Sequence, residues 1–154
     1  IRRPPRSTLS SSSAASDVYK RQHHFNREHD VNFENTGLIT VFDNREDGTD
    51  AGEFLGGSAI RSINPNTHET AYIYPTSRDQ FFFTNAGGKH QLFASGSRLI
   101  TEVRAGRVFE IDSNGKLLWE WYQQPYNDTL VPEVMEGRRY MLTEAEIAQW
   151  KCSK

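Results

Sequence analysis

Two histidines, His29 and His90, stand at matching places in the sequence. The run that starts at His29 aligns without a gap on the run that starts at His90, a shift of 61 residues. A neutral imidazole is a good nucleophile near physiological pH, and it also forms hydrogen bonds. Two such rings directed at one ligand would form a reactive site. The alternative is that each histidine only ties two strands together by a hydrogen bond.

Short strands separated by turn residues must position these histidines. Runs rich in β-branched and aromatic residues predict strands at 38–42, 59–63, 69–74, 107–111 and 117–121. Asn114-Gly115 lies between the last two runs. It is a strong hairpin signal, because both residue types tolerate positive φ.

One helix is predicted, near the end of the chain. Thr143 is suited to the N-cap position, and Glu144 and Glu146 fall in the first turn. The apolar residues Ile147 and Trp150 follow.

The strands recur in two similar sets along the chain. Residues 58–63 align on residues 106–111, so each set holds about four strands, as one β-propeller blade does. A blade needs a neighbour on each face to bury its apolar side chains. We therefore predict an all-β fold, a partial β-propeller of about two four-stranded blades with a short C-terminal helix. A β-sandwich of two sheets is the alternative. In a propeller the first strand of each blade lines the channel, where both histidines would meet.

The first 22 residues differ in composition from the rest. They carry five basic residues against one acid, Asp17, and are rich in Ser, with almost nothing to bury. Such a segment is expected to be disordered. It resembles a translated sequencing adaptor, and we set it apart from the folded part as an artefact. Residues 23–154 form the predicted domain.

Composition narrows the function classes. The net charge of −2 argues against nucleic acid as a partner, because phosphate binding needs a basic face. No apolar run approaches the roughly 20 residues of a membrane span. Gly87-Gly88-Lys89 lacks the spacing of a phosphate-binding loop, and the acidic loop at 43–50 carries Arg45 where a calcium loop needs an oxygen ligand. No cofactor and no metal site are predicted.

Three stretches resemble the arylsulfotransferase family. They are His29-Asp30-Val31 with the run 37–44, then 87–91 with 99–102, and then 106–112 with 115–121. Together they cover roughly residues 28–123. The resemblance implies a six-bladed propeller, of which this chain would supply the C-terminal blades. It also implies a secreted or periplasmic protein.

The resemblance further implies a reaction and its residues. Family enzymes transfer a sulfuryl group from a phenolic sulfate ester to a phenol, through a sulfated histidine and without a nucleotide donor. On this chain the implied catalytic residues are His90 as nucleophile and His29, and Arg45 is the implied contact to the sulfate oxygens. The full-length parent would be the enzyme, whereas this chain alone is expected to be inactive. A non-catalytic propeller used as a binding or scaffold module is the alternative.

Overall fold

The computed structural model describes residues 29–44 and 57–150, which form two compact units that divide after Phe81. The first unit holds β1 (His29–Phe33), β2 (Ile39–Asp43), β3 (Ala59–Ile63), β4 (Thr70–Tyr74) and the 3-10 turn η1 (Arg78–Gln80). The second holds β5 (Lys89–Leu92), β6 (Arg98–Glu102), the 3-10 turn η2 (Val103–Ala105), β7 (Arg107–Ile111), β8 (Leu117–Tyr122) and the helix α3 (Glu144–Ala148).

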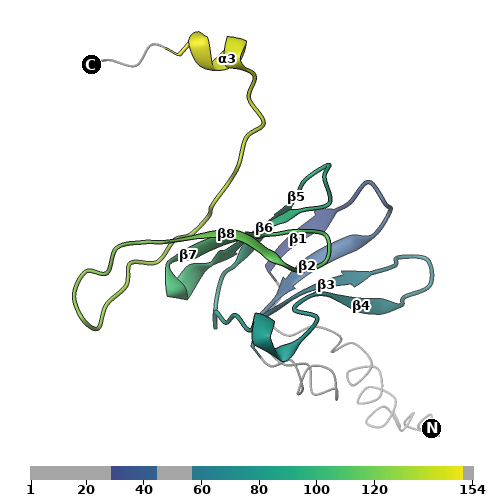
Figure 1. Cartoon of the computed structure of the whole chain (residues 1–154). Coiled ribbons are helices and arrows are strands. Elements are labelled where there is room, and N and C mark those ends of the chain that lie inside the picture. The colour runs from purple at the N-terminus through teal and green to yellow at the C-terminus, as the bar shows by residue number, and fades with distance from the viewer. Residues whose placement is uncertain (1–28, 45–56, 151–154) are drawn as a thin grey trace, which may run out of the picture. The chain divides into compact units, whose positions relative to one another are not determined.

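Each unit contains one antiparallel four-stranded sheet in which neighbours in the chain are neighbours in space (Figure 1). The strand orders are β1-β2-β3-β4 and β5-β6-β7-β8. The fold is therefore all-β, with a short helix near the C-terminal end, and it is consistent with a partial β-propeller of two blades. The five strands predicted from sequence are confirmed, and their ends differ by at most one residue.

The hairpin turns are held by side chains of the expected type. Asn64 begins the β3–β4 turn and Asp112 begins the β7–β8 turn. The side-chain oxygen of each accepts a hydrogen bond from a backbone amide two residues on, at 2.9 Å to Asn66 and 2.8 Å to Asn114. Gly115 takes a φ of 81°, the positive value that the Asn-Gly signal predicts.

The cores consist of side chains from the middle strands of each sheet. In the first unit Phe42 and Ile60 are fully buried. In the second, Ile100 and Phe109 are fully buried, and the ring of Phe109 meets Phe82 edge to face at 5.8 Å. Burial of large apolar side chains is the main stabilising term for both sheets.

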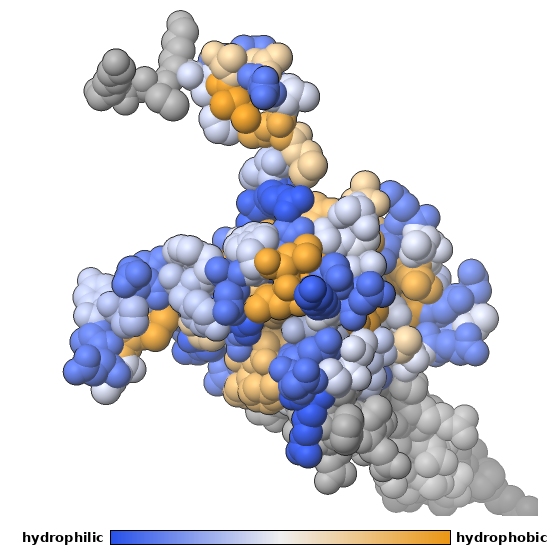
Figure 2. All heavy atoms as spheres, in the orientation of Figure 1, coloured by the Kyte–Doolittle hydropathy of each residue, from blue (hydrophilic) through white to orange (hydrophobic). Residues whose placement is uncertain are grey.

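The predicted helix is confirmed as α3. The Thr143 hydroxyl accepts a hydrogen bond from the Glu146 amide, and the Glu146 carboxylate accepts one from the Thr143 amide at 2.7 Å. Hydrophobic side chains are exposed around this helix, as Figure 2 shows, among them Ile147 and Leu142. Within residues 29–44 and 57–150, no helix has the length and hydrophobicity to cross a membrane.

Candidate functional site

The two predicted histidines lie in different units and in different environments. His29 is the first residue of β1 and is exposed. His90 is the second residue of β5, where it pairs with Ile100 of β6, and it is only 6% exposed. Since the two units are described separately, the structure does not bring these two rings into one site.

The register of the sheets corrects the alignment that paired these histidines. Asn32 pairs with Thr40 in the first sheet and Gln91 with Leu99 in the second, so the equivalent strands are offset by 59 residues and not by 61. The turn glycines Gly37 and Gly96 are also 59 residues apart, with φ values of 82° and 84°. The shift of 61 was wrong, because these glycines close the hairpins and fix the register. His90 therefore corresponds to Val31.

A bulge separates His29 from the regular part of its strand. The pairing shifts between His29 and Asn32, and Asp30 takes a φ of 51°. A bulge interrupts the alternation of side chains between the two faces of a sheet. His29 and His90 are therefore not oriented by the same strand pattern.

Arg45 lies outside the described residues, but the end of β2 that leads to it is described. Asp43 and Asn44 are buried, and Asp43 forms an ion pair with Arg61 at 3.3 Å. The Arg61 guanidinium also lies 4.8 Å from the ring centre of Tyr72. This buried pair joins β2 to β3 next to the chain position of Arg45. Sequence analysis identified Asp43 but not its partner.

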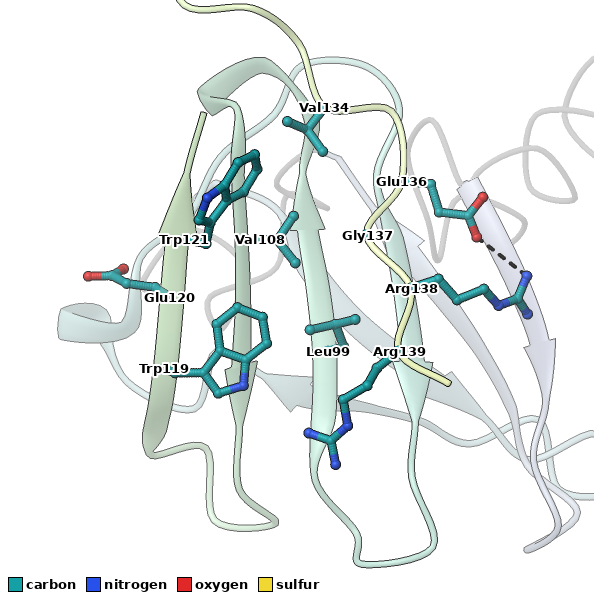
Figure 3. A pocket seen from close by; sticks show the side chains of 10 residues that line it. All are labelled: Leu99, Val108, Trp119, Glu120, Trp121, Val134, Glu136, Gly137, Arg138 and Arg139. Carbon is teal, nitrogen blue, oxygen red and sulfur yellow. Dashed lines mark ion pairs between the residues drawn. The ribbon is translucent and has the colours of Figure 1, made fainter. Parts of the chain in front are cut away.

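An open groove of about 650 Å³ lies on one face of the β5–β8 sheet (Figure 3). The indoles of Trp119 and Trp121 form one wall, and Leu99 and Val108 form the floor between the walls. The opposite wall is an extended segment, residues 133–139, which we call the strap. Its lining residues are Val134, Glu136, Gly137, Arg138 and Arg139.

Backbone and side-chain contacts fix the strap to the sheet. The Gly137 amide donates to the Thr101 hydroxyl at 2.9 Å. Arg139 and Gln91 form a reciprocal pair, in which the Arg139 amide donates to the Gln91 side chain at 3.1 Å and the Gln91 amide group donates to the Arg139 carbonyl at 3.0 Å. Gly137 approaches so closely that a Cβ there would lie 2.6 Å from Val108.

A buried carboxylate, Glu110, lies at one end of the groove and is 3% exposed. It accepts hydrogen bonds from the Trp119 indole at 2.9 Å, from the Ser97 hydroxyl at 2.8 Å and from the Arg139 guanidinium. Arg139 also lies 4.3 Å from the ring centre of Phe93. Because three donors meet one carboxylate, Glu110 links the Trp wall to the strap.

His90 and the groove lie on opposite faces of the same sheet. Successive residues of a strand point to opposite faces, and residues paired directly across two strands share a face. Gln91 contacts the strap and pairs with Leu99, which lines the groove. His90, the residue before Gln91, pairs with Ile100 and therefore faces away from the groove.

A second charged cluster occupies that far face. Figure 3 shows the Glu120 carboxylate directed away from the groove. It pairs with Arg107 at 2.7 Å, and Arg107 also pairs with Glu102 at 3.3 Å. Burial raises the pKa of the Tyr122 hydroxyl in this cluster, an effect that the nearby charge of Arg107 opposes. Within residues 29–44 and 57–150, no group of three or more His, Cys, Asp or Glu side chains is placed to hold a metal ion.

The groove was not predicted from the sequence. The two tryptophans were interpreted there as packing aromatics, yet they are 41% and 47% exposed. The spacing Trp119-Glu120-Trp121 does indicate two indoles on one face of a strand. Nothing in the sequence indicated the strap that lies opposite them.

The two sheets define an all-β protein whose strands are arranged as in propeller blades. A model of the family described as Arylsulfotransferase (ASST) matches residues 12–124, which includes all eight strands and the end of the Ser-rich segment. The chain belongs to the arylsulfotransferase family. This supports an arylsulfotransferase-like function in general, with phenolic substrates. No curated protein matches the chain.

Proposed function

We propose that this chain contributes to the transfer of a sulfuryl group from a phenolic sulfate ester to a phenol through a sulfated histidine. The observation that carries the proposal is the arylsulfotransferase match, which spans both sheets. The first strand of each sheet, β1 and β5, also carries one of the predicted histidines.

In this proposal residues 23–154 form consecutive blades of one propeller, and residues 1–22 do not belong to it. The shared hairpin geometry of the two sheets supports this organisation. The β1–β2 and β5–β6 turns both close with a glycine amide donating three residues back, at 2.9 Å in each case. The same offset relates the register on either side of each turn.

His90 is the proposed nucleophile. One imidazole nitrogen attacks sulfur, an N–S bond forms, and the bond from sulfur to the phenolic oxygen breaks, releasing a phenolate. The oxygen of an acceptor phenol then attacks the same sulfur, the N–S bond breaks, and the acceptor proton is lost to solvent or a base. The burial of His90 on the face away from the groove supports this role, because a sheltered sulfohistidine is protected from hydrolysis.

His29 and Arg45 are the proposed contacts to the sulfate oxygens. A guanidinium or imidazolium donor stabilises the negative charge on these oxygens as sulfur is transferred. The Asp43–Arg61 pair supports the role of Arg45, because it anchors the strand end that leads to that residue. A fixed strand end lowers the entropic cost of holding a charged side chain against the substrate.

The test is a transfer assay on the longest open reading frame that contains this chain, with 4-methylumbelliferyl sulfate as donor and phenol as acceptor. We expect His90→Ala to abolish transfer and to remove the sulfuryl mass increase from the tryptic peptide containing residue 90. His68→Ala is the matched control, because His68 is exposed in the β3–β4 turn. Full transfer by the His90→Ala variant would contradict the assignment.

A further inference from the structure

The groove of the β5–β8 sheet has two walls that are fixed without any ligand. The Trp119 indole is held by its hydrogen bond to Glu110 at 2.9 Å. The strap opposite is held by Gly137 on Thr101 and by the Arg139–Gln91 pair. Its width is therefore set by the fold, and a ligand would find a preformed site.

The lining of the groove matches a flat aromatic molecule. Two indoles on alternate residues of β8 form one wall, and Leu99 and Val108 provide an apolar floor. Gly137 adds no side chain to the strap wall. Aromatic rings stack on indoles or meet them edge to face. The volume of about 650 Å³ lies within the range of roughly 300–1,000 Å³ that is usual for small-molecule sites.

The charges around the groove balance. Arg138 pairs with Glu136 at 3.5 Å, and Arg139 pairs with the buried Glu110. The Glu120 carboxylate points away and is paired with Arg107. Because each cation already has an anionic neighbour, the groove offers no net attraction to a sulfate or carboxylate, and burying such a group would cost its hydration. The charge balance favours a neutral ligand.

We propose that this groove is a binding site for a neutral planar aromatic molecule of one or two rings. The site goes beyond the proposed sulfuryl transfer, because it lies on the face of the sheet opposite His90. A molecule bound there is separated from the His90 ring by the sheet itself. Binding in the groove therefore does not depend on whether the transfer reaction occurs.

The experiment follows the three tryptophan indole signals of the whole chain by ¹H–¹⁵N NMR during a titration with 2-naphthol. Trp119 and Trp121 line the groove, whereas Trp150 does not, so Trp150 is an internal reference. We expect the first two signals to shift in a saturable manner and the third to stay. Trp121→Leu should weaken binding about two- to tenfold, because one aromatic contact is lost, whereas Trp150→Leu should leave it unchanged.

Three results would overturn the proposal. The first is no movement of the Trp119 and Trp121 signals at millimolar 2-naphthol. The second is equal affinity for the anion 2-naphthoate, which would refute the charge argument. The third is a shift of both signals on dilution without ligand, which would assign the groove to contact with a second copy of the chain. None of these outcomes bears on the transfer assay, so this proposal and the proposed function can fail separately.

Discussion

Replacing Gly137 with Ala should detach the strap from the β5–β8 sheet. A Cβ at this position would lie 2.6 Å and 2.8 Å from the two γ-methyl carbons of Val108, whereas carbon atoms in contact are normally about 3.5–4.0 Å apart. The strap would have to move outward by about 1 Å to relieve the clash. That movement would weaken the hydrogen bonds from Gly137 to Thr101 and from Arg139 to Gln91.

Two independent estimates of the cost agree. Overpacking of a close contact costs about 1–3 kcal/mol, and the loss of two hydrogen bonds at about 0.5–1.5 kcal/mol each gives about the same range. Hydrogen exchange at the amides of residues 137 and 139 reports the opening of the strap directly. We expect exchange at both amides to be about 5–150 times faster in Gly137→Ala. Met135→Ala is the control, because Met135 lies on the strap and is exposed.

A double mutant decides whether the clash is the cause. Val108→Ala removes both γ-carbons and should cost about 2 kcal/mol through lost burial and a small cavity. In the double variant Gly137→Ala/Val108→Ala the new methyl group fills the vacated space. The two costs should therefore fall short of additivity by about 1–3 kcal/mol in urea unfolding. Additivity within about 0.5 kcal/mol would refute the steric argument.

Two further outcomes are expected. Arg139→Met should destabilise the second unit by about 2–4 kcal/mol in urea unfolding, because the buried carboxylate of Glu110 loses its cation but keeps two other donors; a loss below about 0.5 kcal/mol would show that Glu110 does not depend on Arg139. The hydrogen bond from the Thr143 amide, followed by that from the Thr143 hydroxyl, lowers the pKa of Glu146, so the cap of α3 should be fully formed above the ordinary pKa of a glutamate and lost as pH falls through the lowered value. The ¹³C shifts of residues 144–148 should follow that titration, whereas Glu146→Gln should make them independent of pH; an α3 unaffected by acid would contradict the cap assignment.

Local sequence signals predicted the strands and the helix because their causes are local. The run Ala59–Ile63 is a strand in both the prediction and the structure, since its side chains alternate and an Asn-initiated turn follows at once. Thr143 and Glu146 form a capping box within four residues, so their contact needs no distant partner. Both features can be inferred from a short window of sequence.

The register between strands could not be found by matching residue types. The similarity of the runs at His29 and His90 suggested a shift of 61 residues, but the hydrogen bonds follow the turn glycines Gly37 and Gly96 and give 59. A turn restricts pairing through backbone geometry, whereas a shared histidine has no such effect. Glycine positions are therefore the better guide to register in this chain.

The groove depends on contacts that no local signal reports. Gln91 and Arg139 are 48 residues apart, and Thr101 and Gly137 are 36 residues apart. The strap has no hydrophobic period, because it is bound mainly through backbone groups and one glycine. Only the Trp119 and Trp121 spacing was visible in advance, and without the strap it indicates a packed face and not a groove.

The alternation of side chains on β5 makes the strap relevant to His90 even though the two lie on opposite faces. Gln91 precedes no turn or loop, and it is the direct chain neighbour of His90. Both hydrogen-bonding groups of its side chain are engaged by the backbone of Arg139. The strap therefore restrains the strand that carries His90 through Gln91, while the sheet blocks direct contact between a groove ligand and the imidazole. Any influence of the groove on the proposed transfer chemistry must pass through the backbone of β5, because no side chain of the groove face reaches across a hydrogen-bonded sheet.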